Sequence, residues 1–105
     1  MRTIEIGGKT YEVRMTWAAL YAWEIGTDRA LKTFRDDRLF DRSLMMLCML
    51  NGANPAQPMT WEEWQKAIDA DPTLVTTLTP LYIEAWTEWQ GMMEGKGRKK
   101  NEEGA

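Results

Sequence analysis

Polar and apolar positions alternate over the first fifteen residues of the chain. Ile4 and Ile6 alternate with polar neighbours before Gly7-Gly8, and apolar side chains alternate again from Tyr11 to Met15. A period of two residues predicts β-strands with one apolar face, and paired glycines supply the positive φ angles of a tight turn. We therefore predict a β-hairpin over residues 1–15. A two-stranded hairpin is marginal alone, so its apolar face is expected to pack against helices.

A helical period replaces this alternation from Thr16 onwards. Thr16 is a favourable N-cap residue, and Gly26 is placed to end the helix in a left-handed conformation. A second, short helix that carries Leu31 and Phe34 is expected next. The first third of the chain is thus predicted to be a hairpin followed by two helices.

The middle of the chain contains its most apolar segment and its clearest helix start. Asp41 is expected to cap a helix over residues 42–51, which is apolar on all sides and therefore predicted to be buried. Thr60 and Glu63 have the spacing of a capping box, which predicts a helix from residue 61 to about residue 70.

The last third of the chain carries one long apolar stripe. Its period of 3.6 residues extends from residue 74 to residue 93, after the start signal Asp71-Pro72. Pro80 interrupts the stripe, so we expect a kink or two separate helices. Residues 95–105, GKGRKKNEEGA, have no large apolar side chain and are predicted to form a disordered basic tail.

These elements together predict a mainly α protein, with the hairpin packed on a bundle of four to five helices. Residues 1–94 are expected to form one domain, because 105 residues suit a single hydrophobic core. This body has nine basic and fourteen acidic residues, for a net charge of −5, while the tail has four basic and two acidic residues. The acidic body argues against nucleic acid as a partner.

The absence of histidine excludes much chemistry. There can be no Ser-His-Asp triad, no Cys-His nucleophile and no HExxH metal site. Adjacent carboxylates such as Glu62-Glu63 point in different directions on a helix, and Cys48 lies in an apolar segment that would bury its thiol. We therefore expect a protein that is not an enzyme, with no cofactor and no metal.

Neither a membrane span nor a signal peptide is predicted. The longest apolar run covers residues 44–50, whereas a spanning helix needs roughly 20 residues. The N-terminus lacks the apolar stretch of a signal peptide, and a single cysteine gives no disulfide framework. A soluble intracellular protein is therefore the default expectation.

Six tryptophans in 105 residues are an unusually high number. Trp64, Trp86 and Trp89 fall on helical apolar stripes and are predicted to lie mainly in the core. Trp17 begins the first predicted helix and is expected to hold that helix to the hairpin.

The other two tryptophans are expected to be exposed. Trp23 lies off the line of its apolar neighbours, and Trp61 opens an otherwise charged turn. Trp and Met are both enriched at the centres of protein interfaces. We therefore hypothesise that Trp23, Trp61, Met92 and Met93 contact a partner protein. An amphipathic helix is one partner that Met-rich helices can bind.

The first 26 residues also carry a short motif. They read I-E-I-G-G-K-T-Y from Ile4 to Tyr11, enter a helix through Thr16, and place Glu24 and Gly26 near its end. This pattern resembles the start of the tail assembly chaperones of long-tailed phages. Members of that family typically begin with an I-x-I-x-G-K-x-Y hairpin and continue as a small helical bundle.

The resemblance implies a non-enzymatic protein of a phage or prophage that acts in the host bacterial cytoplasm. Its implied partners are the long, helix-rich tape measure protein, which it keeps soluble, and the tail tube protein, which it recruits. Many such chaperones also exist in a longer, frameshifted form, for which Lys99-Lys100 could be encoded by a slippery A-rich run. The alternative is a small structural virion protein, such as a head-tail joining or tail-completion protein. A homo-oligomer is left open, and a small enzyme is the third and least favoured hypothesis.

Overall fold

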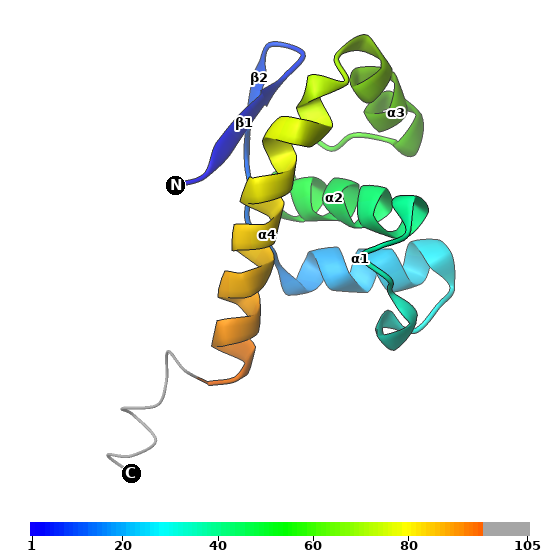
Figure 1. Cartoon of the computed structure of the whole chain (residues 1–105), viewed down its shortest axis with the longest axis vertical. Helices are drawn as coiled ribbons and strands as arrows, with labels where there is room; N and C mark the ends of the chain where they lie inside the picture. The colour runs from blue at the N-terminus through cyan, green and yellow to red at the C-terminus, as the bar shows by residue number, and fades with distance from the viewer. Residues whose placement is uncertain (96–105) are drawn as a thin grey trace.

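A β-hairpin leads into four helices in the computed structural model, which describes residues 1–95 (Figure 1). The elements are β1 (Thr3–Ile6), β2 (Lys9–Glu12), α1 (Trp17–Thr27), a 3-10 turn η1 (Leu31–Thr33), α2 (Leu39–Ala53), α3 (Trp61–Ala70) and α4 (Thr73–Met93). The predicted mainly α architecture with an N-terminal hairpin is confirmed. The prediction of a disordered tail falls, from residue 96 onwards, outside the described residues.

The hairpin forms as its sequence pattern predicts. β1 and β2 are antiparallel, with Ile4 opposite Tyr11, and the turn uses Gly7 at φ 59° and Gly8 at φ 82°. Ile4, Ile6 and Tyr11 are buried on the face that meets the helices. Their burial against α2 and α4 supplies the stability that a free hairpin lacks.

Polar contacts fix the hairpin at both of its edges. The Arg2 guanidinium donates to the Glu88 carboxylate of α4 at 2.8 Å. At the other edge, the Asn54 side chain accepts from the backbone N–H of Glu12 and donates to its carbonyl, both at 2.9 Å. The hairpin therefore joins the end of α2 to the middle of α4.

The helices α1 and α2 pack closely where a glycine permits it. The Thr16 hydroxyl caps α1 as predicted and accepts from the N–H of Ala19 at 3.0 Å. A Cβ at Gly52 of α2 would lie 2.5 Å from this hydroxyl oxygen and 3.2 Å from the Ala19 nitrogen. A larger residue at position 52 would therefore displace the cap or separate the two helices.

Three predicted boundaries are wrong between residues 26 and 42. Helix α1 continues to Thr27, and the left-handed residue is Asp28 at φ 54° rather than Gly26. The expected second helix is only the single turn η1, and α2 begins two residues before Asp41. Asp41 does not cap α2, because its carboxylate makes a tertiary contact that is described below.

The two C-terminal helices follow their start signals. The capping box of α3 is complete, since Thr60 accepts from the N–H of Glu63 and the Glu63 carboxylate accepts from that of Thr60. Helix α4 is continuous through Pro80, so the alternative of two helices is wrong. The Thr79 hydroxyl donates to the carbonyl of Val75 at 2.7 Å in the same turn.

Candidate protein-binding site

The structure contradicts the hypothesis that Trp23 is exposed. Its side chain is completely buried, with the ring edge-on to Phe34 at a centroid distance of 5.5 Å. The Arg29 guanidinium lies over the same ring at 5.0 Å. The segment after α1 folds back over the indole and covers it, so Trp23 is a core residue and not a partner contact.

The structure places Trp61 apart from the two predicted methionines. Trp61 is less exposed than expected, since it is partly buried against the core and packs on Phe40 at a centroid distance of 5.8 Å. Both rings line a groove of about 500 Å³ between α2 and α3, at whose edge Leu39 is exposed. Met92 and Met93 lie at the other end of the molecule, on the last turn of α4 (Figure 1). The four predicted contacts therefore do not form one site.

Most of the other expectations for the tryptophan and methionine residues agree with the structure. Trp64 is completely buried, while Trp86 and Trp89 are partly buried against the core. Met92 and Met93 are exposed as expected. The methionines of α2, in contrast, belong to the core and cannot form a partner groove.

An exposed apolar stripe on α1 was not predicted. Trp17, Tyr21 and Ile25 are spaced four residues apart and are 68%, 62% and 65% exposed. The expectation that Trp17 holds α1 to the hairpin is wrong, because the hairpin packs on α2 and α4. The sequence does contain a signal, since α1 carries two apolar stripes and only the one with Leu20 and Trp23 is buried.

A small cavity joins this stripe to the end of α4. It has a volume of about 110 Å³ and is lined by Trp17, Leu20, Tyr21, Glu24, Leu31 and Met93. Binding sites for small molecules usually measure roughly 300–1,000 Å³. The cavity therefore suits one aliphatic side chain of a partner protein better than a cofactor. We call Trp17, Tyr21, Ile25 and Met93 the α1–α4 surface, whereas Met92 is exposed but does not line the cavity.

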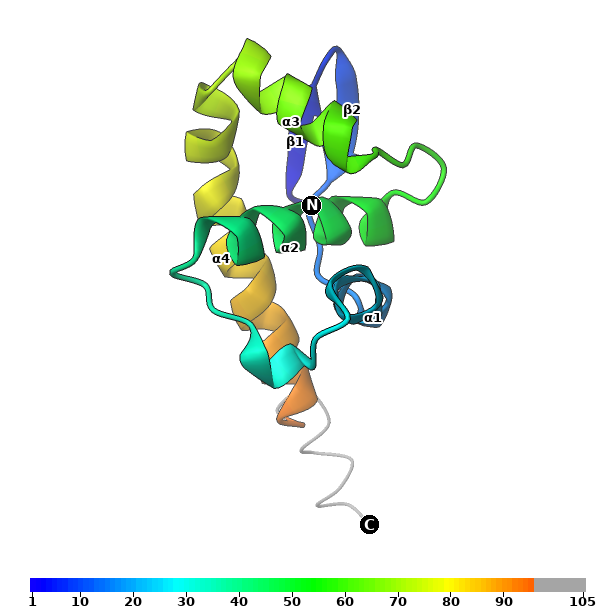
Figure 2. The same cartoon turned by 90° about the vertical axis from the view of Figure 1, so that its right-hand side faces the viewer.

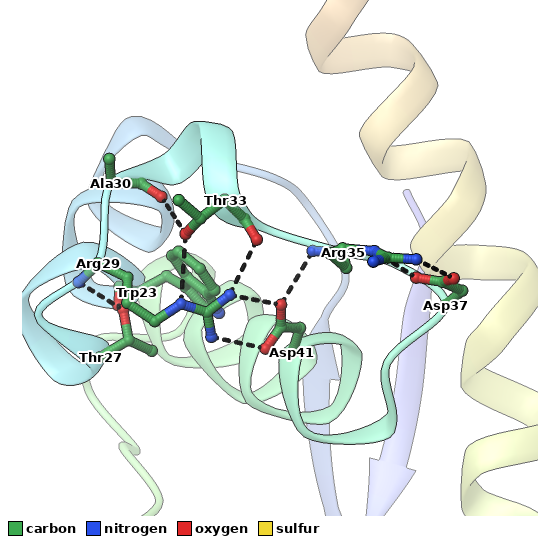
Figure 3. Close-up of polar contacts among 8 residues, drawn as sticks. All are labelled: Trp23, Thr27, Arg29, Ala30, Thr33, Arg35, Asp37 and Asp41. Carbon is green, nitrogen blue, oxygen red and sulfur yellow. Dashed lines mark hydrogen bonds and ion pairs between the residues drawn. The ribbon is translucent and has the colours of Figure 1, made fainter.

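A buried ion pair holds the wall of this cavity in place (Figure 3). The fully buried Asp41 carboxylate accepts from both terminal nitrogens of Arg29, at 2.9 and 3.0 Å, and from the backbone N–H of Arg35 at 2.9 Å. The hydrogen bonds from Arg29 are the main reason that the pKa of Asp41 falls to about 2. Arg29 also donates to the carbonyl of Thr33. This network ties the segment that carries Leu31 to the first turn of α2.

The surface itself contains almost no charge. Glu24 is the one charged residue within α1, and its carboxylate accepts from the N–H of Leu31 at 2.5 Å. An exposed apolar face with almost no charge is typical of a protein-binding site.

The other chemically notable groups are structural. Burial raises the pKa of the Cys48 thiol to about 11, which disfavours the reactive thiolate. Burial also raises the pKa of Tyr82, whose hydroxyl donates to Asp36 and accepts from the indole N–H of Trp86. Within residues 1–95, no group of three or more His, Cys, Asp or Glu side chains is arranged to hold a metal ion.

The fold and this surface define a small, mainly α protein with an N-terminal hairpin and an uncovered apolar helix face. No helix in the described part of the chain is both long enough and apolar enough to cross a membrane. Comparisons with protein-family models, with curated proteins and with solved structures found no significant match.

Proposed function

We propose that the protein is a non-enzymatic phage tail assembly chaperone that binds its client through the α1–α4 surface. The resemblance of its first 26 residues supplies the client, which is the tape measure protein, and a second partner, the tail tube protein. The proposed site of action is the host bacterial cytoplasm. The exposed stripe of α1 is the observation that carries the proposal.

The physical argument rests on the hydration of three large side chains. Trp17, Tyr21 and Ile25 form one continuous row over two turns of helix, about two-thirds exposed in each case. Transfer of a large apolar side chain from water to a buried site contributes about 1.5–3 kcal/mol. A client helix that lays apolar residues along this row and into the neighbouring cavity gains part of this free energy at each contact, because each side chain is already about one-third buried.

Co-expression with a tape measure protein tests the proposal. The client is the very long, helix-rich reading frame expected next to this gene, and the readout is the fraction of client that remains soluble and co-purifies. The wild-type chain is expected to keep the client soluble, and Tyr21→Asp to lose most of that effect. Leu39→Asp is the matched control, because Leu39 is also a large, exposed apolar residue but lies at the α2–α3 groove. Equal activity of Tyr21→Asp and wild type would contradict the proposal.

The groove between α2 and α3 favours a second candidate function. A protein with two separate apolar surfaces, one of them around Leu39, Phe40 and Trp61, is suited to lie between two neighbours in an assembly. A small head-tail joining or tail-completion protein has that position. Mass spectrometry of purified virions separates the two functions, since a chaperone is absent from the particle and a structural subunit is present in fixed copy number.

A further inference from the structure

We propose that a second copy of this chain covers the exposed face of α1, in an antiparallel pair of α1 helices centred on Tyr21. Figure 2 views α1 nearly along its axis, with α2 and η1 beside it and no element of residues 1–95 on its outer side. The pairing needs no ligand and no second protein. It follows from the order of side chains along this one helix.

The exposed face of α1 is complementary in shape to itself. Its large residues, Trp17, Tyr21 and Ile25, form a row with a spacing of four. A parallel row of small residues lies directly beside it and consists of Ala18, Ala22 and Gly26, all exposed. Rows of residues four apart are the ridges and grooves by which helices pack. The ridge of one copy can therefore enter the groove of the other.

Charge selects the antiparallel orientation. An antiparallel pair centred on Tyr21 places Trp17 opposite Ile25 of the second copy, and Glu24 opposite its Ala18. Glu24 and Asp28, the acidic residues near the C-terminal end of α1, are then kept apart from the same residues of the second copy. A parallel pair would instead bring the two Asp28 carboxylates together. The antiparallel pair also leaves Glu24 with its existing partner, the Leu31 N–H.

The C-terminal tail is a poor occupant of this face. Residues 96–105 contain no apolar side chain larger than that of alanine, so they cannot replace water over Trp17 and Tyr21. A client helix uses the same face and therefore competes with the second copy. This competition rests on the proposed function, whereas the pairing of two copies does not. Self-association would then keep the face covered until a client displaces the second copy.

Sedimentation equilibrium over a wide concentration range tests the pairing. The wild-type chain is expected to pass from 12.2 kDa to twice that mass as its concentration rises. Tyr21→Glu, which places two carboxylates at the centre of the pair, is expected to raise the dimer Kd at least tenfold. Leu39→Glu is the control at another exposed apolar position and is expected to leave the dimer Kd unchanged. A chain that stays monomeric throughout, or a dimer that only Leu39→Glu disrupts, would overturn the proposal.

Cysteine crosslinking tests the orientation. Residues 17 and 25 of two copies lie opposite each other only in the antiparallel pair, so a chain that carries both Trp17→Cys and Ile25→Cys is expected to form a disulfide-linked dimer under oxidising conditions. Each single variant is expected to form little of this dimer, because the native Cys48 is buried. Crosslinking of each single variant to its own copy, as in a parallel pair, would reject the antiparallel register.

These measurements separate the pairing from the proposed function. A monomeric chain that still binds the client would reject the pairing and leave the function standing. A dimer that does not bind the client would reject the proposed function and leave the pairing standing.

Discussion

Trp17 and Trp23 lie on the same helix, and the structure gives opposite consequences for removing their rings. Trp23 is completely buried, in contact with Phe34 and Arg29, whereas Trp17 is 68% exposed. Truncation of a buried tryptophan to alanine costs about 3–5 kcal/mol, because the transfer free energy is lost and a cavity remains. A surface substitution usually changes stability by less than about 0.5 kcal/mol. Trp23→Ala is therefore expected to be strongly destabilising and Trp17→Ala nearly neutral.

The expected loss at Trp23 is large compared with the whole stability of a domain, which is typically about 5–15 kcal/mol. In a chain of this size each kcal/mol shifts the melting temperature by roughly 4–8 °C. The Trp23 indole N–H is buried without a hydrogen-bond partner among the described residues. Trp23→Phe keeps a ring and removes that unpaired donor, so it is expected to cost clearly less than Trp23→Ala.

Urea unfolding followed by far-ultraviolet circular dichroism measures these differences without relying on tryptophan fluorescence. The protein concentration must be low enough to keep the chain monomeric, since a dimer through α1 would add its own stabilisation. The m-values are expected to agree with that of the wild type. A loss above about 2 kcal/mol in Trp17→Ala, or below about 1 kcal/mol in Trp23→Ala, would refute the assignment of the two faces of α1.

Three further predictions concern single groups. Thr60→Ala removes the cap of α3 and is expected to cost about 1 kcal/mol in urea unfolding, so an unchanged midpoint would contradict the capping role. The pKa of Asp41 is lowered from 3.8 to about 2, so its contribution to stability is complete above about pH 4 and lost as pH falls towards 2. Urea midpoints measured between pH 4 and pH 2 should fall less steeply in Asp41→Asn, and equal slopes would reject this linkage. Cys48 should not react with a thiol reagent at pH 8 until the protein is unfolded, and rapid labelling of the native chain would contradict its burial.

Local signals in the sequence predict the ends of this molecule well. The hairpin follows from alternation and the Gly7-Gly8 turn, and the start of α3 follows from Thr60 and Glu63. In each case the residues that determine the structure are neighbours in the chain. The long apolar stripe likewise predicts α4, although the stripe alone does not decide between one kinked helix and two helices at Pro80.

The candidate site was largely missed because it depends on contacts between distant residues. Both stripes of α1 are apolar, so the sequence alone does not say which one is buried. The choice is made by tertiary packing, because α2 lies against the face of α1 that carries Ala19, and the segment after α1 places Phe34 on Trp23. Trp17 then remains in solvent. The structure thus reverses the prediction for these two tryptophans, because Trp23 is buried and Trp17 is exposed.

Site-specific photocrosslinking during co-expression with the tape measure protein tests most directly whether the α1–α4 surface binds a client. A benzophenone amino acid placed at Tyr21 is expected to form a covalent product with the tape measure protein, and the same group at Leu39 is expected to form little or none. Mass spectrometry identifies the linked peptides. Crosslinks to the tape measure protein from position 39 alone, or from neither position, would contradict the account.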